Sequence, residues 1–313
     1  MEKLTPFLAA LGAALLALFF LVSPFDFVLH ADFMPSAVFL FVNALAVAYL
    51  SSLTKARSSW PLSLLGLLPL ISTDFAIPVL VAMALFSFWC ATKLEDSARL
   101  SAAGAGLAYL YALPWAFYGT CSYFLIYPIA MIFAVSLHTF PRTFRERPFE
   151  LLGYASLLTH PLFFFSHYFL ALSLAMYFVA AKYYKLREFC SFAKGVGGVA
   201  GRGLSYYCYG HAFALASVTY PFLFKGLSFL HAFMLGFVSI HIFIHMPTML
   251  PPLLGIPNAR RYNLYPYVLS LAASASWPFF KDLAWLLYAL ALGAALYVFL
   301  PNPLSFKRGQ RKP

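Results

Sequence analysis

The sequence predicts an all-α bundle of transmembrane helices, and three observations lead to this prediction. Of the 313 residues, 63% are hydrophobic and only 10% are charged, whereas an average soluble domain is about half apolar and a quarter charged. The mean hydropathy is +0.81. The charged residues gather between long apolar runs, a pattern typical of a multi-pass membrane protein. We therefore expect residues 1–313 to form a single bundle in contact with membrane lipid.

The apolar runs divide into about 12 predicted spans, each bounded by charged or turn-forming residues. The runs 60–92 and 149–184 are too long for one helix, so we expect breaks at Ser72-Thr73-Asp74 and near Ser166. If both runs are re-entrant hairpins, the number of full spans falls to about eight. The predicted spans are about 6–28, 33–53, 60–72, 75–92, 100–119, 121–140, the two halves of 149–184, 204–224, 226–246, 262–280 and 283–300.

Two short segments are predicted to be loops between these spans. The first contains Asp26, His30 and Asp32, and the second is the glycine-rich segment 195–203. The pattern GVGGVAGRG in the second has no preceding strand, so it is a linker and not a dinucleotide site.

The basic residues predict that both termini lie in the cytoplasm. Of the 21 Lys and Arg, all but Lys225 and Lys281 fall on one side of the twelve-span arrangement, and basic residues favour the cytoplasmic side. Residues 301–313 then form a basic cytoplasmic tail attracted to anionic lipid. The same distribution accounts for the net charge of +11, so we expect no nucleic-acid partner.

The four cysteines carry no recognisable motif. Cys90, Cys121, Cys190 and Cys208 form neither a CxxC nor a CxxCH pattern, so a zinc ribbon and covalent haem attachment lack support. We expect them to be small packing residues.

The histidines in the segment 226–246 are the main functional signal. His231, His241 and His245 fall within an arc of about 80° if the segment is a regular helix, and His231 and His245 are then about 21 Å apart along its axis. An imidazole in hydrocarbon is costly without a partner, so an intramembrane histidine is a functional candidate. Metals and haem iron are common partners for several imidazoles at once.

The predicted topology sorts the eight histidines by depth. A bis-histidine haem takes one imidazole from each of two facing helices. We expect an inner haem on His211 with His241 or His245, with His138 in reserve. An outer site would use His231 with His167 or His30, and His160 lies between the layers as a further metal candidate. Arg142, Arg202 and Arg260 are candidates to bind haem propionates. The alternative interpretation is that these histidines only make hydrogen bonds between helices.

The string HAFMLGFVSIHIFIHMPTMLPPLLG, residues 231–255, resembles a motif of the twelve-span NnrS-type membrane proteins of bacteria and archaea. The resemblance implies haem or copper, a link with nitric oxide metabolism and a layout broadly similar to the catalytic subunit of haem-copper oxidases. It also implies the plasma membrane of a prokaryote. The oxidase pattern itself is absent, because His160-Pro161 is not followed by Glu-Val-Tyr and no His-His pair occurs.

The predicted function is that of an integral haem-b protein, with copper as an alternative metal, for electron transfer or small-gas chemistry. Such an oxidoreductase or electron-transfer subunit would have respiratory or cytochrome subunits as partners. Two other functions stay open: a cofactor-free transporter, and a structural subunit of a respiratory complex. All ten Asp and Glu fall at predicted span ends, which argues against proton-coupled transport.

Overall fold

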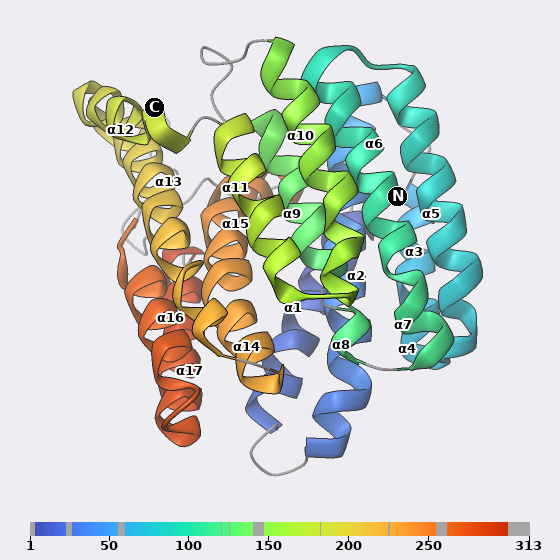
Figure 1. Ribbon diagram of the computed structural model, residues 1–313. Coiled ribbons are helices and arrows are strands. Elements are labelled where there is room, and N and C mark those ends of the chain that lie inside the picture. The colour runs from blue at the N-terminus through green and yellow to red at the C-terminus, as the bar shows by residue number, and fades with distance from the viewer. Residues whose placement is uncertain are drawn as a thin grey trace, which may run out of the picture. The chain divides into compact units, whose positions relative to one another are not determined.

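The computed structural model describes residues 4–22, 27–55, 60–119, 121–124, 126–139, 147–181, 183–224, 226–254 and 262–299. Within these ranges every regular element is helical and none is a strand, which confirms the all-α prediction (Figure 1). The chain forms two compact units, residues 1–184 and 185–313, where a single bundle was expected.

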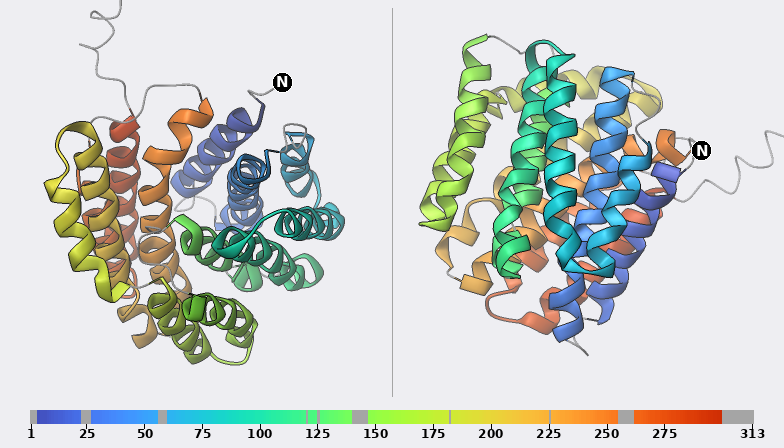
Figure 2. Two further views of the ribbon diagram at one scale, coloured as in Figure 1. Left: turned by 90° about the horizontal axis from the view of Figure 1, so that it is seen from above. Right: turned by 90° about the vertical axis from the view of Figure 1, so that its right-hand side faces the viewer.

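Unit 1 consists of helices joined by short turns, and the right-hand view of Figure 2 shows its helices side by side. In its core, Phe39 packs against Tyr109 and Tyr127, and the Tyr109 hydroxyl donates a 2.9 Å hydrogen bond to Asn43 Oδ1. The elements are α1 (Leu4–Val22), α2 (Phe27–Thr54), α3 (Trp60–Leu64), η1 (Leu65–Leu67), α4 (Leu68–Ile71), η2 (Thr73–Phe75), α5 (Ala76–Thr92), α6 (Asp96–Tyr111), α7 (Leu113–Tyr118), α8 (Cys121–Phe124), α9 (Ile126–Thr139), α10 (Arg147–Thr159), η4 (His160–Phe164) and α11 (His167–Ala180), and η5 (Tyr183–Lys185) lies at the boundary with unit 2.

Both predicted hairpin breaks are confirmed, and each has a serine at its turn. Ser72 and Ser166 have extended backbone conformations, and each side chain accepts a hydrogen bond from the N–H two residues later. This is the N-cap contact that starts a new helix by satisfying one of its first N–H groups. The two hairpins also share a Ser-Leu-Leu segment, at 63–65 and 156–158, and a Pro-Leu pair before the capping serine.

Unit 2 contains the histidine-rich segment. Its elements are α12 (Leu186–Gly195), α13 (Gly198–Ser217), η6 (Tyr220–Leu223), α14 (Gly226–Phe233), the π-helix η7 (Met234–Val238), α15 (Ser239–Leu254), α16 (Tyr265–Ser276) and α17 (Lys281–Phe299).

Both predicted loops are partly helical. Helix α2 begins at Phe27, so His30 and Asp32 belong to it, while Asp26 lies outside the described residues. Most of the glycine-rich segment forms the start of α13. Glycine is needed there because a Cβ at Gly201 would collide with the carbonyl oxygen of Val196, and one at Gly203 would lie 3.2 Å from the Tyr262 hydroxyl.

The described residues contain five helices that are long and apolar enough to cross a membrane, or six if the bent pair Tyr168–Ala180 and Tyr183–Gly195 is one span. The twelve spans predicted from the sequence are therefore not supported. The reason is clear for α16, whose 12 residues cover only about 18 Å of a hydrocarbon core of about 30 Å. The five candidates are Phe33–Thr54, Thr73–Thr92, Asp96–Tyr118, Ser228–Pro247 and Lys281–Val298.

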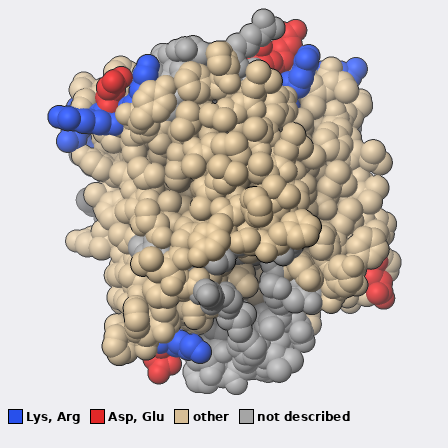
Figure 3. Space-filling model, in the orientation of Figure 1, with Lys and Arg blue, Asp and Glu red and all other residues tan. Residues whose placement is uncertain are grey.

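Few charged side chains interrupt the described surface that Figure 3 shows, and most of that surface consists of uncharged residues. Exposed apolar side chains are numerous and include Leu85, Leu158 and Leu286. Such a surface is compatible with contact to membrane lipid.

Candidate functional site

The helix that carries His231, His241 and His245 is interrupted between the first and second of these residues. Residues 234–238 form the π-helix η7 between α14 and α15. A π-helix turns through a smaller angle per residue than an α-helix, so it rotates the following residues relative to the preceding ones. The expected shared face therefore ends at η7: His231 stacks on Trp277 with ring centroids 4.3 Å apart, while His241 and His245 face α13.

Hydroxyl groups of neighbouring helices stabilise the π-helix. Ser270 and Ser274 of α16 donate hydrogen bonds to the carbonyl oxygens of Leu235 and Ala232. Ser239 donates to the carbonyl of Met234 over 2.7 Å. In hydrocarbon every backbone polar group needs a partner, and these serines supply one where the regular helical bonding is disturbed.

Three imidazoles from two helices meet in unit 2, and we call them the histidine cluster: His211 of α13 with His241 and His245 of α15. The ring centroid of His211 lies 5.5 Å from that of His241 and 6.4 Å from that of His245. His211 and His241 are fully buried, and Nε2 of His245 is also buried. We expected these three histidines at one depth, and the structure brings them together.

Two further contacts orient the histidine cluster. Nδ1 of His241 lies 2.8 Å from the carbonyl oxygen of Phe237. Because a carbonyl only accepts hydrogen bonds, Nδ1 carries the proton of this contact, as the second nitrogen of a metal-bound imidazole commonly does. The ring of Tyr207 makes edge contacts with two imidazoles. Its centroid lies 4.6 Å from that of His211 and 5.8 Å from that of His245. Tyr207 was missed in the sequence, although its position four residues before His211 places both on one helix face.

A close contact between α13 and α15 sets the spacing of the histidine cluster. A Cβ at Gly210 would collide with Cγ1 of Ile244 and lie 2.8 Å from Cζ and the hydroxyl oxygen of Tyr267. The Tyr206 hydroxyl donates to the Phe243 carbonyl over 3.1 Å, and the Tyr267 hydroxyl donates to the Tyr206 carbonyl over 3.3 Å. These bonds tie α13, α15 and α16 together beside the imidazoles.

The other predicted site residues do not join the histidine cluster in the part of the chain that the structure describes. His160 is buried in unit 1, where its Nδ1 lies 2.8 Å from both the Ser156 carbonyl and Ser173 Oγ. Arg202 lines a pocket at the start of α13, about 14 Å along the helix axis from His211. The backbones of His30, His138 and His167 are helical, but their side chains lie outside the described residues, as do Arg142 and Arg260 entirely.

A disulfide bond joins α12 to α13. Cys190 and Cys208 are bonded, with Cα atoms 5.6 Å apart, which corrects the expectation that both are only packing residues. Their pairing cannot be read from spacing alone, because four cysteines allow several connectivities. Cys90 is a buried free thiol, and the Cys121 side chain lies outside the described residues.

No three His, Cys, Asp or Glu side chains within the described ranges are arranged so that they could hold one metal ion. The histidine cluster therefore offers pairs of imidazoles and not a formed three-ligand site. The chain matches no protein-family model, and neither the curated proteins nor the solved structures contain a detectable match to it. The likeness of residues 231–255 to NnrS-type proteins accordingly stays a prediction.

Proposed function

We propose that this chain is a multi-pass membrane protein in which unit 2 binds a redox-active metal between His211 and His241, for electron transfer or small-gas chemistry. The observation that carries the proposal is the 5.5 Å separation of these two buried rings, which come from different helices. The rings of His245 and Tyr207 also contact that of His211.

The ring separations suit a shared ion. Two imidazoles that each bind one ion through a bond of about 2.0–2.1 Å place their ring centroids roughly 5 to 6.5 Å apart, depending on the angle at the metal. The separations of 5.5 and 6.4 Å in the histidine cluster both fall in this range. The Phe237 carbonyl contact favours His241 as the first partner of His211, because metal-bound imidazoles usually donate their other N–H to such a group.

The packing favours a bare ion over haem. A porphyrin lies between its two axial imidazoles and extends well beyond them. The contact of Gly210 with Ile244 and Tyr267, directly beside His211, leaves α13 and α15 too close for a macrocycle in this conformation. Imidazole ligands suit copper, zinc, iron and nickel. Among these divalent ions, copper has the highest affinity for such ligands and also undergoes one-electron chemistry, so we favour copper and keep haem b as the second candidate.

Metal analysis of the purified protein tests this proposal. We expect about one copper ion per chain, and loss of the copper when His211 and His241 are both replaced by Ala. His231→Gln is the matched control, because His231 is on the same span but stacks on Trp277. A sharp α-band in the reduced spectrum would assign the site to haem b instead. A metal-free, colourless and folded wild-type protein would contradict both forms of the proposal.

A transporter is the second candidate function, favoured by the broken helices of unit 1. Short helical pieces separated by extended serines at Ser72 and Ser166 resemble the discontinuous helices that form substrate sites in transporters. Substrate-dependent uptake by sealed vesicles that contain metal-free protein would favour this function over the metal site.

We also propose that both termini face the cytoplasm of a prokaryotic cell, which requires an even number of membrane passes. The positions of the basic residues support this orientation. Respiratory or cytochrome subunits are the proposed redox partners. Labelling of single cysteines placed before residue 4 and after residue 300, from each side of the membrane, tests the orientation. Labelling from opposite sides would refute it.

A further inference from the structure

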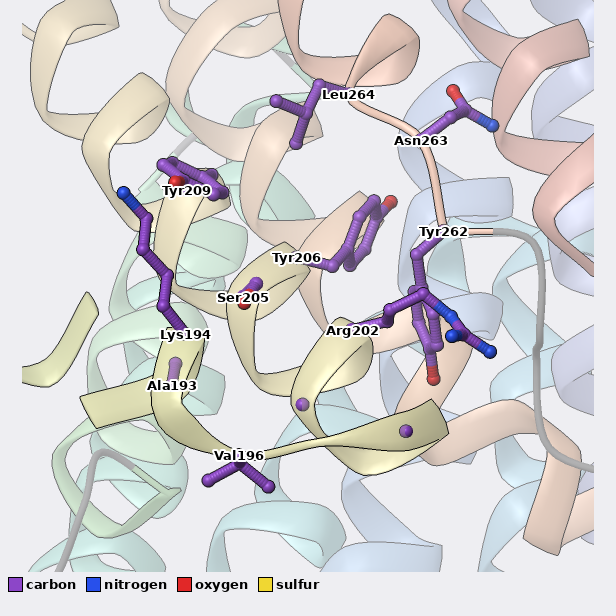
Figure 4. Close-up of a pocket in the computed structure, with 12 residues that line it drawn as sticks. Ala193, Lys194, Val196, Arg202, Ser205, Tyr206, Tyr209, Tyr262, Asn263 and Leu264 are labelled. Carbon is purple, nitrogen blue, oxygen red and sulfur yellow. The ribbon is translucent and has the colours of Figure 1, made fainter. Parts of the chain in front are cut away.

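Unit 2 contains a pocket of about 450 Å³ that the metal proposal does not use (Figure 4). It lies where the chain leaves α12 and enters α13, and the segment 262–264 closes one side. The amphipathic helix α12 forms the adjoining wall: Leu186, Phe189 and Ala193 are buried, while Arg187 and Lys194 are exposed. Such a helix is typical of the membrane–water interface.

The pocket is lined by cations and contains no acid. Lys194 and Arg202 both line it, and none of the lining residues is Asp or Glu. The Lys194 amino group lies 5.8 Å from the ring centroid of Tyr209, within the range of a cation–π contact. Figure 4 shows Lys194 and Arg202 extending from two different helices and away from each other, with Lys194 beside Tyr209 and the Arg202 side chain beside the Tyr262 ring. Two cations at one pocket give it a positive potential that favours an anionic ligand.

Backbone and hydroxyl groups add to this character. Gly198 has φ of 72°, a left-handed conformation that glycine adopts readily, and a Cβ at that position would meet no atom within 4 Å. Burial raises the pKa of the Tyr262 phenol above its ordinary value, while the charge of Arg202 opposes this rise. The phenol is therefore protonated at neutral pH and can donate a hydrogen bond.

We propose that this pocket binds the phosphate group of an anionic phospholipid. The Arg202 guanidinium and the Tyr262 hydroxyl recognise the phosphate, Lys194 at the other end of the pocket adds to its positive potential, and the exposed Leu264 offers an apolar surface to an acyl chain. The interfacial character of α12 places the pocket at headgroup depth, which favours a lipid headgroup over a free phosphate ion. This site is separate from the histidine cluster and does not depend on a metal.

Native mass spectrometry of the full-length, delipidated protein tests the proposal by titration with phosphatidylglycerol and phosphatidylcholine. We expect phosphatidylglycerol to bind more tightly, and the double variant Lys194→Gln with Arg202→Gln to lose roughly 10- to 30-fold in affinity. The control variant Arg187→Gln with Lys281→Gln removes the same charge from exposed positions outside the pocket. It should stay within about twofold of wild type.

Thermal unfolding with millimolar inorganic phosphate separates the two sources of the phosphate group. Inorganic phosphate could stabilise the wild type but not the Lys194/Arg202 variant, while the lipid titration shows no preference for phosphatidylglycerol. That combination would support a free phosphate ligand and overturn the lipid assignment. Tyr262→Phe removes a single hydroxyl and should weaken phosphatidylglycerol binding by roughly 3- to 10-fold even if the double variant does not fold. The site would be overturned if the pocket and control variants lost the same affinity for phosphatidylglycerol. It would also be overturned if the wild type neither preferred phosphatidylglycerol over phosphatidylcholine nor was stabilised by inorganic phosphate.

Discussion

Replacing Gly210 with Ala should push α13 away from α15 and α16 beside the histidine cluster. The new methyl group would collide with Ile244 Cγ1 and lie 2.8 Å from Tyr267 Cζ. Carbon atoms in contact prefer separations of about 3.5–4.0 Å, so the helices must separate by roughly 1 Å. Overpacking of this kind costs about 1–3 kcal/mol. Because Gly210 precedes His211, the same displacement should also weaken metal binding.

Gly293→Ala provides a matched control within unit 2. Both glycines are helical, so both substitutions gain the same helix propensity of up to about 1 kcal/mol. A Cβ at Gly293 meets no atom within 4 Å, so only Gly210→Ala carries the overpacking cost. At about 2–4 °C per kcal/mol, Gly210→Ala should melt roughly 2–12 °C below Gly293→Ala.

Thermal unfolding in detergent, followed by circular dichroism, measures this difference directly, and metal content is measured on the same samples. A Gly210→Ala protein that melts at or above the Gly293→Ala protein and keeps its full metal content would refute the reasoning. It would mean that α13 and α15 are not held in close contact beside His211.

Two further predictions concern the elements around the histidine cluster. Replacing Ser270 and Ser274 by Ala should each lower the free energy of unfolding by about 0.6 kcal/mol, because each hydroxyl bonds a carbonyl near the π-helix. Ser276→Ala, whose hydroxyl bonds only its own helix, should cost less in the same unfolding measurement, and an equal cost would contradict this role. Cys190 and Cys208 should resist a maleimide mass tag in denaturant until a reductant is added. Serine at both positions should cost about 3 kcal/mol for a loop of this length, and tagging of both thiols before reduction would rule the disulfide out.

The local features of the fold were predictable from the sequence. Hydropathy indicated helices throughout, and the serines at positions 72 and 166 marked both hairpin breaks, because N-capping is decided by residues close in the chain. The spacing of His241 and His245 placed them on one helix face, and α15 is regular between them. His211 was assigned to the same depth from the predicted topology alone, and its ring lies beside those of His241 and His245.

The features that depend on distant residues were not predictable. The π-helix at Met234–Val238 is stabilised by serines on α16 about 40 residues away, so the periodicity of its own segment gave no sign of it. His231 therefore does not lie on the predicted shared face but stacks on Trp277. The helix at the glycine-rich segment and the Cys190–Cys208 bond likewise arise from tertiary contacts.

X-ray absorption at the edge of the bound metal is the most direct test of the central proposal. We predict two imidazole nitrogens at about 2.0 Å from the metal, a signal that His231→Gln leaves unchanged and that His211→Ala with His241→Ala abolishes. A metal ligated only by sulfur or oxygen, or an imidazole signal that survives in the double variant, would contradict it.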